Sequence, residues 1–327
     1  MPHRCVGRIA LTTAVPDISI VIVSRNTREL LRACLRSIGE HGDGYTVETI
    51  VVESNSHDGT VAMVRASFPA VILLEPGENT GFARGNNLGI TRARGDAVLL
   101  LNPDTELTAG ALAALHRALF ADPAVGVVGP LLRYPDGTIQ SSRRRFPTLA
   151  TALVESTVVQ EWWPDHPALA RYYRADMPDD LPQDVDWLVG ACLLVRREVF
   201  TAVGLLDERL FLYAEEPEWC WRVRRAGWRV HFVPEAEVRH HEGTSTGQNV
   251  TARQRAFALS KTHLMGELYG PVAGLVTRVA LVADQTVRLT REAAKWSLGH
   301  KRDLRAARVL AAWATLRALL LPPGRGR

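Results

Sequence analysis

Short apolar runs alternate with amphipathic segments through the first hundred residues. The runs at residues 18–23, 47–52, 71–74 and 97–101 are dense in aliphatic and β-branched side chains, which predicts four strands. After the first run, apolar side chains recur at helical spacing from Glu29 to about Ile38, with Asn26 or Thr27 as the N-cap. Strands that alternate with helices indicate parallel βαβ units in a doubly wound α/β sheet.

The same pattern predicts the remaining elements. A second helix follows Asp58-Gly59-Thr60, and residues 81–85 are expected to be a loop before a short helix over 86–94. Further helices are predicted over 109–120, 198–203 and 217–226, and strands over 125–128, 188–195 and 229–233. Residues 133–145 read as a hairpin around Pro135-Asp136-Gly137, and residues 146–183 as irregular.

Composition adds limits to this picture. The 327 residues, 46% hydrophobic and 23% charged, are typical of a globular chain, and one large domain with an appendage is expected. The four cysteines are scattered without a CxxC pair, so neither a zinc site nor a disulfide framework is predicted. A reducing cytoplasm is then the expected location. No apolar run reaches the length of a membrane-spanning helix.

Charge divides the chain unevenly. Residues 271–327 contain 11 Lys or Arg and 3 Asp or Glu, while the whole chain carries +4. In this basic tail, apolar residues recur at helical spacing at Val276, Val279, Ala280, Ala283 and Val287, and again at Val309, Ala312, Trp313 and Leu316. Such helices can lie on an anionic membrane. The alternative is that they pack on the main domain or on a second copy of the chain.

A carboxylate follows the most apolar strand. Pro103 cannot continue a strand ladder, so Asp104 is expected just beyond the carboxyl end of residues 97–101. Ligands bind at that edge of open α/β sheets. A carboxylate there suits a hard divalent cation, which can neutralise a diphosphate. The alternative is an ordinary turn or helix N-cap.

Three acids occur together at Glu215, Glu216 and Glu218, after the aromatic run Phe211-Leu212-Tyr213. Their mutual repulsion can raise one pKa toward neutrality, as a general base requires. The alternative is an acidic first turn favoured by the helix dipole. Residues 79–86 only loosely match a glycine fingerprint, and they follow the third strand. A dinucleotide-binding enzyme is therefore not expected.

Seven motifs in order resemble one family. They are VIVSRN (21–26), VVESNSHDGT (51–60), NTGFARGNN (79–87), LNPD (101–104), WLVGA (187–191), FLYAEEPEWCWR (211–222) and HHEGTS (240–245). Together they resemble glycosyltransferase family 2, in its rhamnosyltransferase-like branch. The resemblance covers about residues 17–247. It implies a GT-A fold, which is Rossmann-like with a mostly parallel central sheet flanked by helices, and here with a helical C-terminal appendage.

The resemblance also implies roles for individual residues. Nucleotide-sugar contacts fall on Ser24, Asn26, Glu53, Asp58, Asn79, Gly81, Asn86, Asn102 and Arg222. Glu53 stands where the family has aspartate. Asp58 has the alternative of forming a turn with Gly59, and Arg222 that of a solvated helix charge. Trp187, Gly190 and Ala191 fall on the acceptor side.

Asp104 matches the last aspartate of the family's metal-binding DxD motif, and Asn102 replaces the first. Mg²⁺ or Mn²⁺ would then be held mostly by the diphosphate and water, with His240 as the second protein ligand and His241 in reserve. Glu216 falls on the position of the general base. Glu218 falls on the family's second acidic position, and Glu215 completes the expected catalytic group.

The predicted domains are a leader (1–16), a catalytic domain (17–247) and a basic helical region (248–327). The predicted activity is inverting, metal-dependent transfer of a sugar from dTDP-rhamnose or a UDP-sugar. The acceptor is a glycan or a lipid-linked glycan of cell-wall or surface-polysaccharide synthesis. The protein is expected in the cytoplasm, peripheral to the inner face of the membrane, with a second copy as a candidate partner and no nucleic acid. The alternatives are a nucleotidyltransferase on a similar sheet and a non-catalytic nucleotide-sugar-binding protein.

Overall fold

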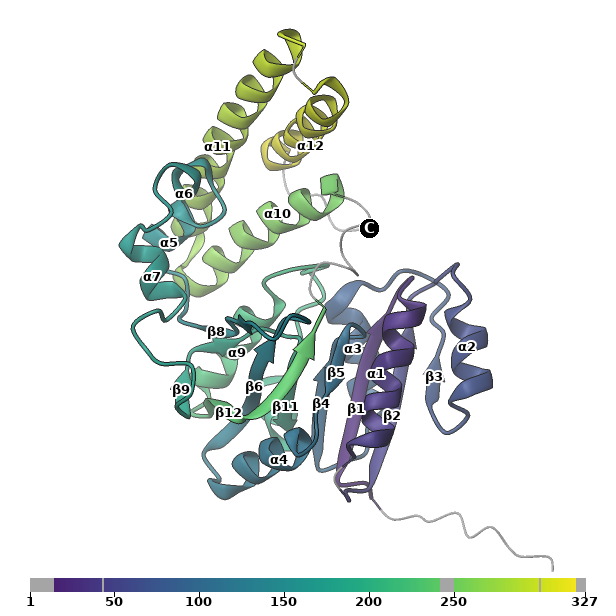
Figure 1. The fold of residues 1–327 in the computed structure, drawn as a ribbon. Coiled ribbons are helices and arrows are strands. Elements are labelled where there is room, and N and C mark those ends of the chain that lie inside the picture. The colour runs from purple at the N-terminus through teal and green to yellow at the C-terminus, as the bar shows by residue number, and fades with distance from the viewer. Residues whose placement is uncertain (1–14, 43, 242–249, 300, 322–327) are drawn as a thin grey trace, which may run out of the picture.

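The computed structural model describes residues 15–42, 44–241, 250–299 and 301–321. Its centre is a mixed ten-stranded sheet whose main path runs β3-β2-β1-β4-β11-β6-β12-β5, with helices against both faces (Figure 1). Most of the predicted leader, residues 1–14, lies outside the described residues. So does the predicted domain boundary at 247/248.

The first half of the fold has the predicted βαβ pattern. Its elements are β1 (Ile18–Ser24), α1 (Arg28–Glu40), β2 (Val47–Glu53), α2 (Thr60–Ser67), β3 (Ile72–Leu74), α3 (Gly81–Arg92) and β4 (Ala97–Leu101). β1 pairs in parallel with both β2 and β4, and β2 with β3. These four strands therefore end at one edge of the sheet.

The second half mixes strand directions. Its elements are β5 (Thr105–Leu107), α4 (Ala111–Ala121), β6 (Val125–Arg133), β7 (Ile139–Gln140), β8 (Arg143–Arg144), β9 (Gln183–Val185), β10 (Trp187–Leu188), β11 (Cys192–Arg196), α8 (Arg197–Val203), α9 (Glu215–Arg225) and β12 (Arg229–His240). β11 runs antiparallel between β4 and β6, and β12 runs parallel to β6. β12 therefore points the same way as β4, and both end at the same edge.

Alternation along the strands gives the sheet two hydrophobic cores. Ile18, Ile20 and Ile22 point to one face, where α1, α2 and α4 pack, and Val21 points to the other, under α3, α8 and α9. Both faces are apolar because a parallel sheet is covered by helices on both sides. Cys34, Cys192 and Cys220 are buried free thiols in these cores.

Several local predictions were wrong. The predicted loop at 81–85 is the first turn of α3, and the strand predicted over 188–195 is split into β10 and β11 around residues 189–191. Residues 146–183 are not irregular, because they contain α5 (Leu149–Val154), α6 (Val158–Trp162) and α7 (Pro167–Tyr172). The predicted hairpin is partly confirmed, as β7 pairs antiparallel with β6. β12 extends to His240, well beyond the predicted residue 233.

Three long helices follow the sheet: α10 (Val250–Tyr269), α11 (Pro271–Ser297) and α12 (Arg302–Leu320). They pack on one another and stand at the sheet edge where β1 and β12 end (Figure 1). α11 contacts α5 and α6, and α10 contacts α9. The packing alternative for the basic tail is thus the observed arrangement. Among the described residues, no helix is long and apolar enough to cross a bilayer.

Candidate active site

The predicted nucleotide and metal residues share one sheet edge. Ser24 and Glu53 are the last residues of β1 and β2, which pair in register there. Asn102 follows β4, and its backbone N–H donates to the carbonyl of Ala191 at 2.9 Å. This bond places the residues just before β11 beside the end of β4. The edge is therefore built from segments that lie far apart in the sequence, from Ser24 to Ala191.

Asp104 and His240 face each other at this edge. The short strand β5 turns back beside β12, and its first residue, Thr105, is in register with His240. His240 Nε2 lies 3.3 Å from Asp104 Oδ1, and both side chains are buried. The pairing of β5 with β12, which the sequence pattern did not indicate, is what brings the two predicted metal ligands together.

Gln140 orients His240 from the neighbouring strand β7. Its Oε1 lies 2.9 Å from His240 Nδ1, so Nε2 is the nitrogen turned toward Asp104. A partner on the other ring nitrogen is the usual support of a metal-binding histidine. His241, the reserve ligand, is instead paired with Glu106 at 2.5 Å. Sequence reasoning missed Gln140, and only its place on the predicted hairpin indicates it.

The described residues contain no cluster of three or more His, Cys, Asp or Glu side chains able to hold a metal. The site thus offers one carboxylate oxygen and one imidazole nitrogen. Both donors are deeply buried and held in place. This donor set fits a divalent cation that takes its remaining ligands from a bound diphosphate and water.

The predicted nucleotide residues also shape the loops at the edge. Asn26, at φ 52°, accepts a hydrogen bond from the His57 N–H and donates its own N–H to Ser56. Ser24 Oγ is hydrogen-bonded to Thr27 Oγ1. Thr27 occupies the N-cap position of α1, as predicted, but its side chain makes no capping hydrogen bond.

Asp58 supplies that cap instead. One of its oxygens accepts the Arg28 N–H at the start of α1, and the other accepts the N–H and hydroxyl of Thr60 at the start of α2. Burial acts to raise the pKa of Asp58, but these hydrogen bonds outweigh it and hold the pKa below its ordinary value. The turn alternative therefore describes its observed contacts, and a nucleoside contact stays a prediction.

Four more predicted nucleotide residues lie at this edge or on α3. Glu53 is buried and accepts the Ser56 N–H at 2.7 Å. Asn79 accepts the Gly81 N–H at the start of α3. A Cβ on Gly81, at φ +68°, would lie 2.6 Å from the Phe211 carbonyl, so glycine is required there. Asn86 is buried and donates to the Phe82 carbonyl within α3, one turn from the edge.

Glu216 lies against a glycine beside this edge. Its Oε1 accepts the Gly190 N–H at 3.0 Å, and a Cβ on Gly190 would lie 2.3 Å from the same oxygen. Only glycine lets the carboxylate approach the backbone this closely. Burial raises the pKa of Glu216, although the Gly190 N–H acts in the opposite direction. A raised pKa brings a carboxylate closer to the range of a general base.

Glu215 occupies a different environment. Its side chain is buried at the start of α9, and its Oε1 has no hydrogen-bond partner among the described residues. Burial, reinforced by the charge of Glu216, raises its pKa well above the ordinary value. The two acids therefore differ in their contacts, because Glu216 accepts the Gly190 N–H and Glu215 Oε1 has no such partner among the described residues. The catalytic role of either acid stays a prediction.

Glu218 and Arg222 form an ion pair one helical turn apart. Arg222 Nε and Nη2 donate to the two Glu218 oxygens, each at 2.8 Å. Arg222 also donates to the carbonyls of Val203 and Leu205. The pair connects α9 to the end of α8 and the loop that follows it. A catalytic role for Glu218 and a phosphate contact for Arg222 stay predictions.

The segment before α9 is strained. Tyr213 and Ala214 have φ values of 71° and 70°, in the left-handed region that residues with a Cβ rarely adopt. Such strain costs about 1–3 kcal/mol per residue and concentrates at functional sites. Here it turns the chain directly into the helix that carries Glu216.

Of the predicted acceptor residues, Gly190 contacts Glu216, and Trp187 and Ala191 are buried nearby in the chain. Trp187 is buried and donates its indole N–H to the Arg145 carbonyl. Tyr172 lies beside it. Ala191 is fully buried. Of the three, Gly190 contacts the candidate base, whereas Trp187 supports the surrounding wall.

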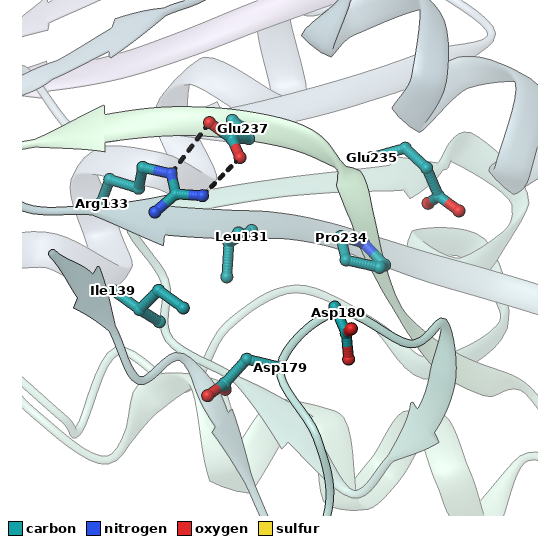
Figure 2. A pocket seen from close by; sticks show the side chains of 8 residues that line it. All are labelled: Leu131, Arg133, Ile139, Asp179, Asp180, Pro234, Glu235 and Glu237. Atoms are coloured by element: carbon teal, nitrogen blue, oxygen red, sulfur yellow. Dashed lines mark hydrogen bonds and ion pairs between the residues drawn. The ribbon is translucent and has the colours of Figure 1, made fainter. Parts of the chain in front are cut away.

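A separate cavity of about 390 Å³ lies beside β6, β7 and β12. Figure 2 shows Arg133 paired with Glu237 there, and Asp179, Asp180 and Glu235 nearby. Neighbouring strand residues point to opposite faces, so Ile139 of this cavity and Gln140 lie on different sides of β7. With four carboxylates and one arginine, the cavity would repel a diphosphate.

Comparisons with known proteins agree with this geometry. The family model "Glycosyl transferase family 2" matches residues 19–204. The chain is 36% identical over 214 residues to the N-acetylglucosaminyl-diphospho-decaprenol L-rhamnosyltransferase of Mycobacterium tuberculosis, covering 62% of this chain and 69% of that protein. It is 23% identical over 241 residues to the rhamnosyltransferase WbbL of Escherichia coli, covering 68% and 82% of the two chains.

Two solved structures share the fold. The mannosyltransferase PcManGT of Pyrobaculum calidifontis, in complex with GDP-Man and Mn²⁺, has a TM-score of 0.54 at 20% identity, over 93% of this chain and 88% of that one. GalNAc-T7 with UDP, GalNAc and Mn²⁺ has a TM-score of 0.58 at 15% identity, over 94% and 56%. The predicted GT-A fold is confirmed.

Proposed function

Because the chain belongs to glycosyl transferase family 2, we propose that this glycosyltransferase moves rhamnose from dTDP-rhamnose to a lipid-linked diphospho-glycan. The M. tuberculosis relative, named for rhamnosyl transfer to a diphospho-decaprenol acceptor, supports the transferred sugar and the acceptor class. The product would enter cell-wall or surface-polysaccharide synthesis. A UDP-sugar remains the second donor class.

One observation carries the proposal: two sites of complementary chemistry meet at one edge. The facing pair Asp104–His240 follows β4 and ends β12, and Glu216 reaches the same edge through Gly190. Ala191, next to Gly190, is hydrogen-bonded to Asn102, two residues before Asp104. Metal-assisted departure of a diphosphate and deprotonation of an acceptor need these two sites side by side.

In the proposed mechanism, the loops after β1 and β2 would bind the nucleoside, and Asp104 and His240 would hold Mn²⁺ or Mg²⁺. The bound cation would neutralise the charge that develops on the leaving diphosphate. The nitrogen ligand favours Mn²⁺, because Mg²⁺ is bound mainly by oxygen. The Mn²⁺ in the two solved neighbours agrees with this choice.

Glu216 would take the proton of the acceptor hydroxyl. The acceptor oxygen forms a bond to the anomeric carbon as the bond from that carbon to the diphosphate oxygen breaks. A single base on the acceptor side implies attack opposite the leaving group, and therefore inversion. Gly190 orients the carboxylate through its N–H, and the strained turn at Tyr213 and Ala214 positions the helix start.

The acceptor's lipid suggests a membrane role for the C-terminal helices. On α11, Val272, Leu275 and Val279 are 72%, 60% and 61% exposed, and they lie on one face at helical spacing. Lys295, Lys301, Arg302 and Arg317 are exposed near the helix ends. We propose that this face rests on an anionic membrane surface, with the protein peripheral on the cytoplasmic side.

A donor panel tests the proposed function. Purified full-length protein is offered dTDP-rhamnose, UDP-glucose, UDP-N-acetylglucosamine and GDP-mannose, with a short-chain polyprenyl-diphospho-N-acetylglucosamine as the acceptor. Release of nucleoside diphosphate and the mass of the product are measured. Acceptor-dependent rhamnosylation is expected with dTDP-rhamnose. Transfer from another donor alone, or none from any donor, would contradict the proposal.

A further inference from the structure

A second cavity, of about 580 Å³, lies between the C-terminal helices and the catalytic domain. Its walls come from α6, α10, α11, α12 and the turn before α9. No residue that the sequence analysis placed in the site lines it. Its charged lining consists of Arg253, Arg288, Arg291, Arg308, Glu161 and Glu292.

Cations exceed carboxylates around this cavity. Arg288 and Arg291 share the carboxylate of Glu161, at 2.7 and 2.6 Å. Glu292 is already paired with Arg305 at 2.5 Å, and Arg308 lies 3.9 Å from it. Among the described residues, Arg253 makes no ion pair, and its guanidinium lies over the Tyr213 ring. Four arginines and two glutamates leave an excess of two positive charges.

The cavity adjoins the turn that carries the candidate base. Tyr213, in its wall, is three residues before Glu216, and its ring packs edge-on against Phe257 of α10. Ser260 of α10 donates a hydrogen bond to the Leu212 carbonyl at 3.0 Å. α10 therefore connects the arginine-lined cavity to the strained turn before α9. A group bound in the cavity would therefore lie against the turn that leads into Glu216.

We propose that this cavity binds the diphosphate of the lipid-linked acceptor, an inference that rests on the proposed function. Guanidinium groups bind phosphate oxygens in bidentate pairs, and the excess of two charges matches a diphosphate diester. The donor's diphosphate is assigned to Asp104 and His240, at the ends of β4 and β12. None of the residues at the ends of β1, β2 and β4 lines the cavity. The remaining anionic substrate group is that of the acceptor.

A binding experiment tests the cavity without any turnover. Inorganic pyrophosphate is titrated calorimetrically into the full chain without divalent metal, so that metal-dependent binding at Asp104 is silent. The test variant is Arg253→Gln with Arg308→Gln, because these two exposed arginines make the fewest contacts. The matched control is Arg255→Gln with Arg317→Gln, which removes the same charge from the same two helices outside the cavity.

The test variant should bind pyrophosphate about tenfold or more weakly, as expected for lost charge-assisted hydrogen bonds, and the control should bind like the wild type. Equal binding by all three proteins, or none by the wild type at millimolar pyrophosphate, would overturn the assignment. The calorimetric result does not depend on the donor panel, because it requires no transfer. If the protein transfers rhamnose but the test variant binds pyrophosphate like the wild type, only the assignment of the cavity is wrong.

A kinetic experiment separates the two diphosphates. The test variant should raise the KM for the polyprenyl-diphospho acceptor about tenfold or more, with the KM for the donor unchanged. An alkyl glycoside acceptor with the same sugar but no phosphate should be used equally well by wild type and variant. A raised donor KM with an unchanged acceptor KM would assign the cavity to the donor instead. An equal loss with the phosphate-free acceptor would also contradict the proposal.

Discussion

The sheet and helix α11 bury opposite kinds of side chain. In the sheet, Leu99 and Leu101 are in the core, and Glu53 and Asp104 stand at the edge where β2 and β4 end. In α11, Thr277, Asp284, Gln285 and Glu292 are buried, whereas Val272, Leu275 and Val279 are exposed. The sheet is therefore held by apolar burial, whereas the helical unit combines an apolar cluster of Ala258, Leu281 and Leu319 with buried polar contacts.

The buried polar contacts of α11 tie distant segments together. Asp284 accepts the Val158 N–H at the start of α6 and pairs with Arg288. Glu292 pairs with Arg305 of α12. Apolar contacts tolerate changes of partner of similar volume, but a buried ion pair that loses one partner leaves an uncompensated charge. The comparison predicts that single changes damage the two regions in different ways.

The largest effect is expected at the sheet edge. Asp104→Asn should lower transfer about 10³-fold, because in the proposed mechanism the carboxylate would hold a metal worth several kcal/mol to the departing diphosphate. Nucleoside diphosphate binding in Mn²⁺ should weaken as well. The thermal midpoint should stay close to that of the wild type. Steady-state transfer and calorimetric titration measure these effects.

Asp165→Asn, a change at an exposed loop aspartate, is the control for Asp104→Asn. It should behave like the wild type. Full activity of Asp104→Asn, or wild-type activity that survives chelation, would remove the metal assignment.

The helical unit should respond in its folding. Glu292→Ala leaves Arg305 buried without its counter-ion, which costs about 3–5 kcal/mol. Backbone amides of residues 302–320 should then exchange with solvent about 10²-fold faster or more, while those of β1 and β4 stay protected. Hydrogen exchange followed by mass spectrometry measures both segments in one experiment. If Glu292→Ala accelerates amide exchange equally in residues 302–320 and in β1 and β4, the helical unit does not depend on its own ion pairs in the way proposed.

A smaller effect is expected on the exposed face of α11. Leu275→Glu with Val279→Glu adds two negative charges and removes apolar surface that would contact lipid. Sedimentation with anionic vesicles at low salt should fall about tenfold or more. The control is Ala62→Glu with Ala66→Glu, an exposed pair with the same spacing on α2. If the wild type does not sediment, or both variants sediment alike, this face does not bind membrane.

The smallest effect concerns Glu215 and has a defined pH dependence. Its folded pKa is raised by burial, so the folded protein binds this proton more tightly than the unfolded chain. The raised pKa therefore does not lower the free energy of unfolding at a pH below the ordinary carboxyl pKa. As the pH rises from there toward the folded pKa, the free energy of unfolding falls. Glu215→Gln should raise the thermal midpoint by about 1–3 °C at pH 8, and less at pH 5. A gain that is larger at pH 5 would contradict the assignment.

Sequence patterning predicts the βαβ half well because its strands are long apolar runs. It fails for α5, α6 and α7, which have only five or six residues each. α5 and α6 contact α11, more than 100 residues away, and α7 contacts α5. β5 has three residues and is defined by its pairing with β12. The structure of such short elements depends on tertiary contacts, which the local hydrophobic periodicity of the sequence does not reveal.

The candidate site also divides into residues that the sequence predicts and contacts that it does not. Asp104 and Glu53 lie at the ends of predicted parallel strands, so a shared edge is expected for them, and His240 was expected through the resemblance. Contacts between side chains are beyond such reasoning. Examples are the contact of Gln140 with His240 and the ion pair between Glu218 and Arg222. The arginine-lined cavity likewise exists only where four helices meet the turn at Tyr213.

The central claim, that Glu216 is the base of a glycosyl transfer at this edge, is tested most directly by comparing Glu216→Gln with Glu215→Gln. Turnover is measured beside the affinity for nucleoside diphosphate in Mn²⁺. Glu216→Gln should lower turnover about 10²-fold or more with unchanged nucleotide affinity, and Glu215→Gln should keep most of the wild-type turnover. Retained turnover in Glu216→Gln, above all with turnover lost in Glu215→Gln, would contradict the account.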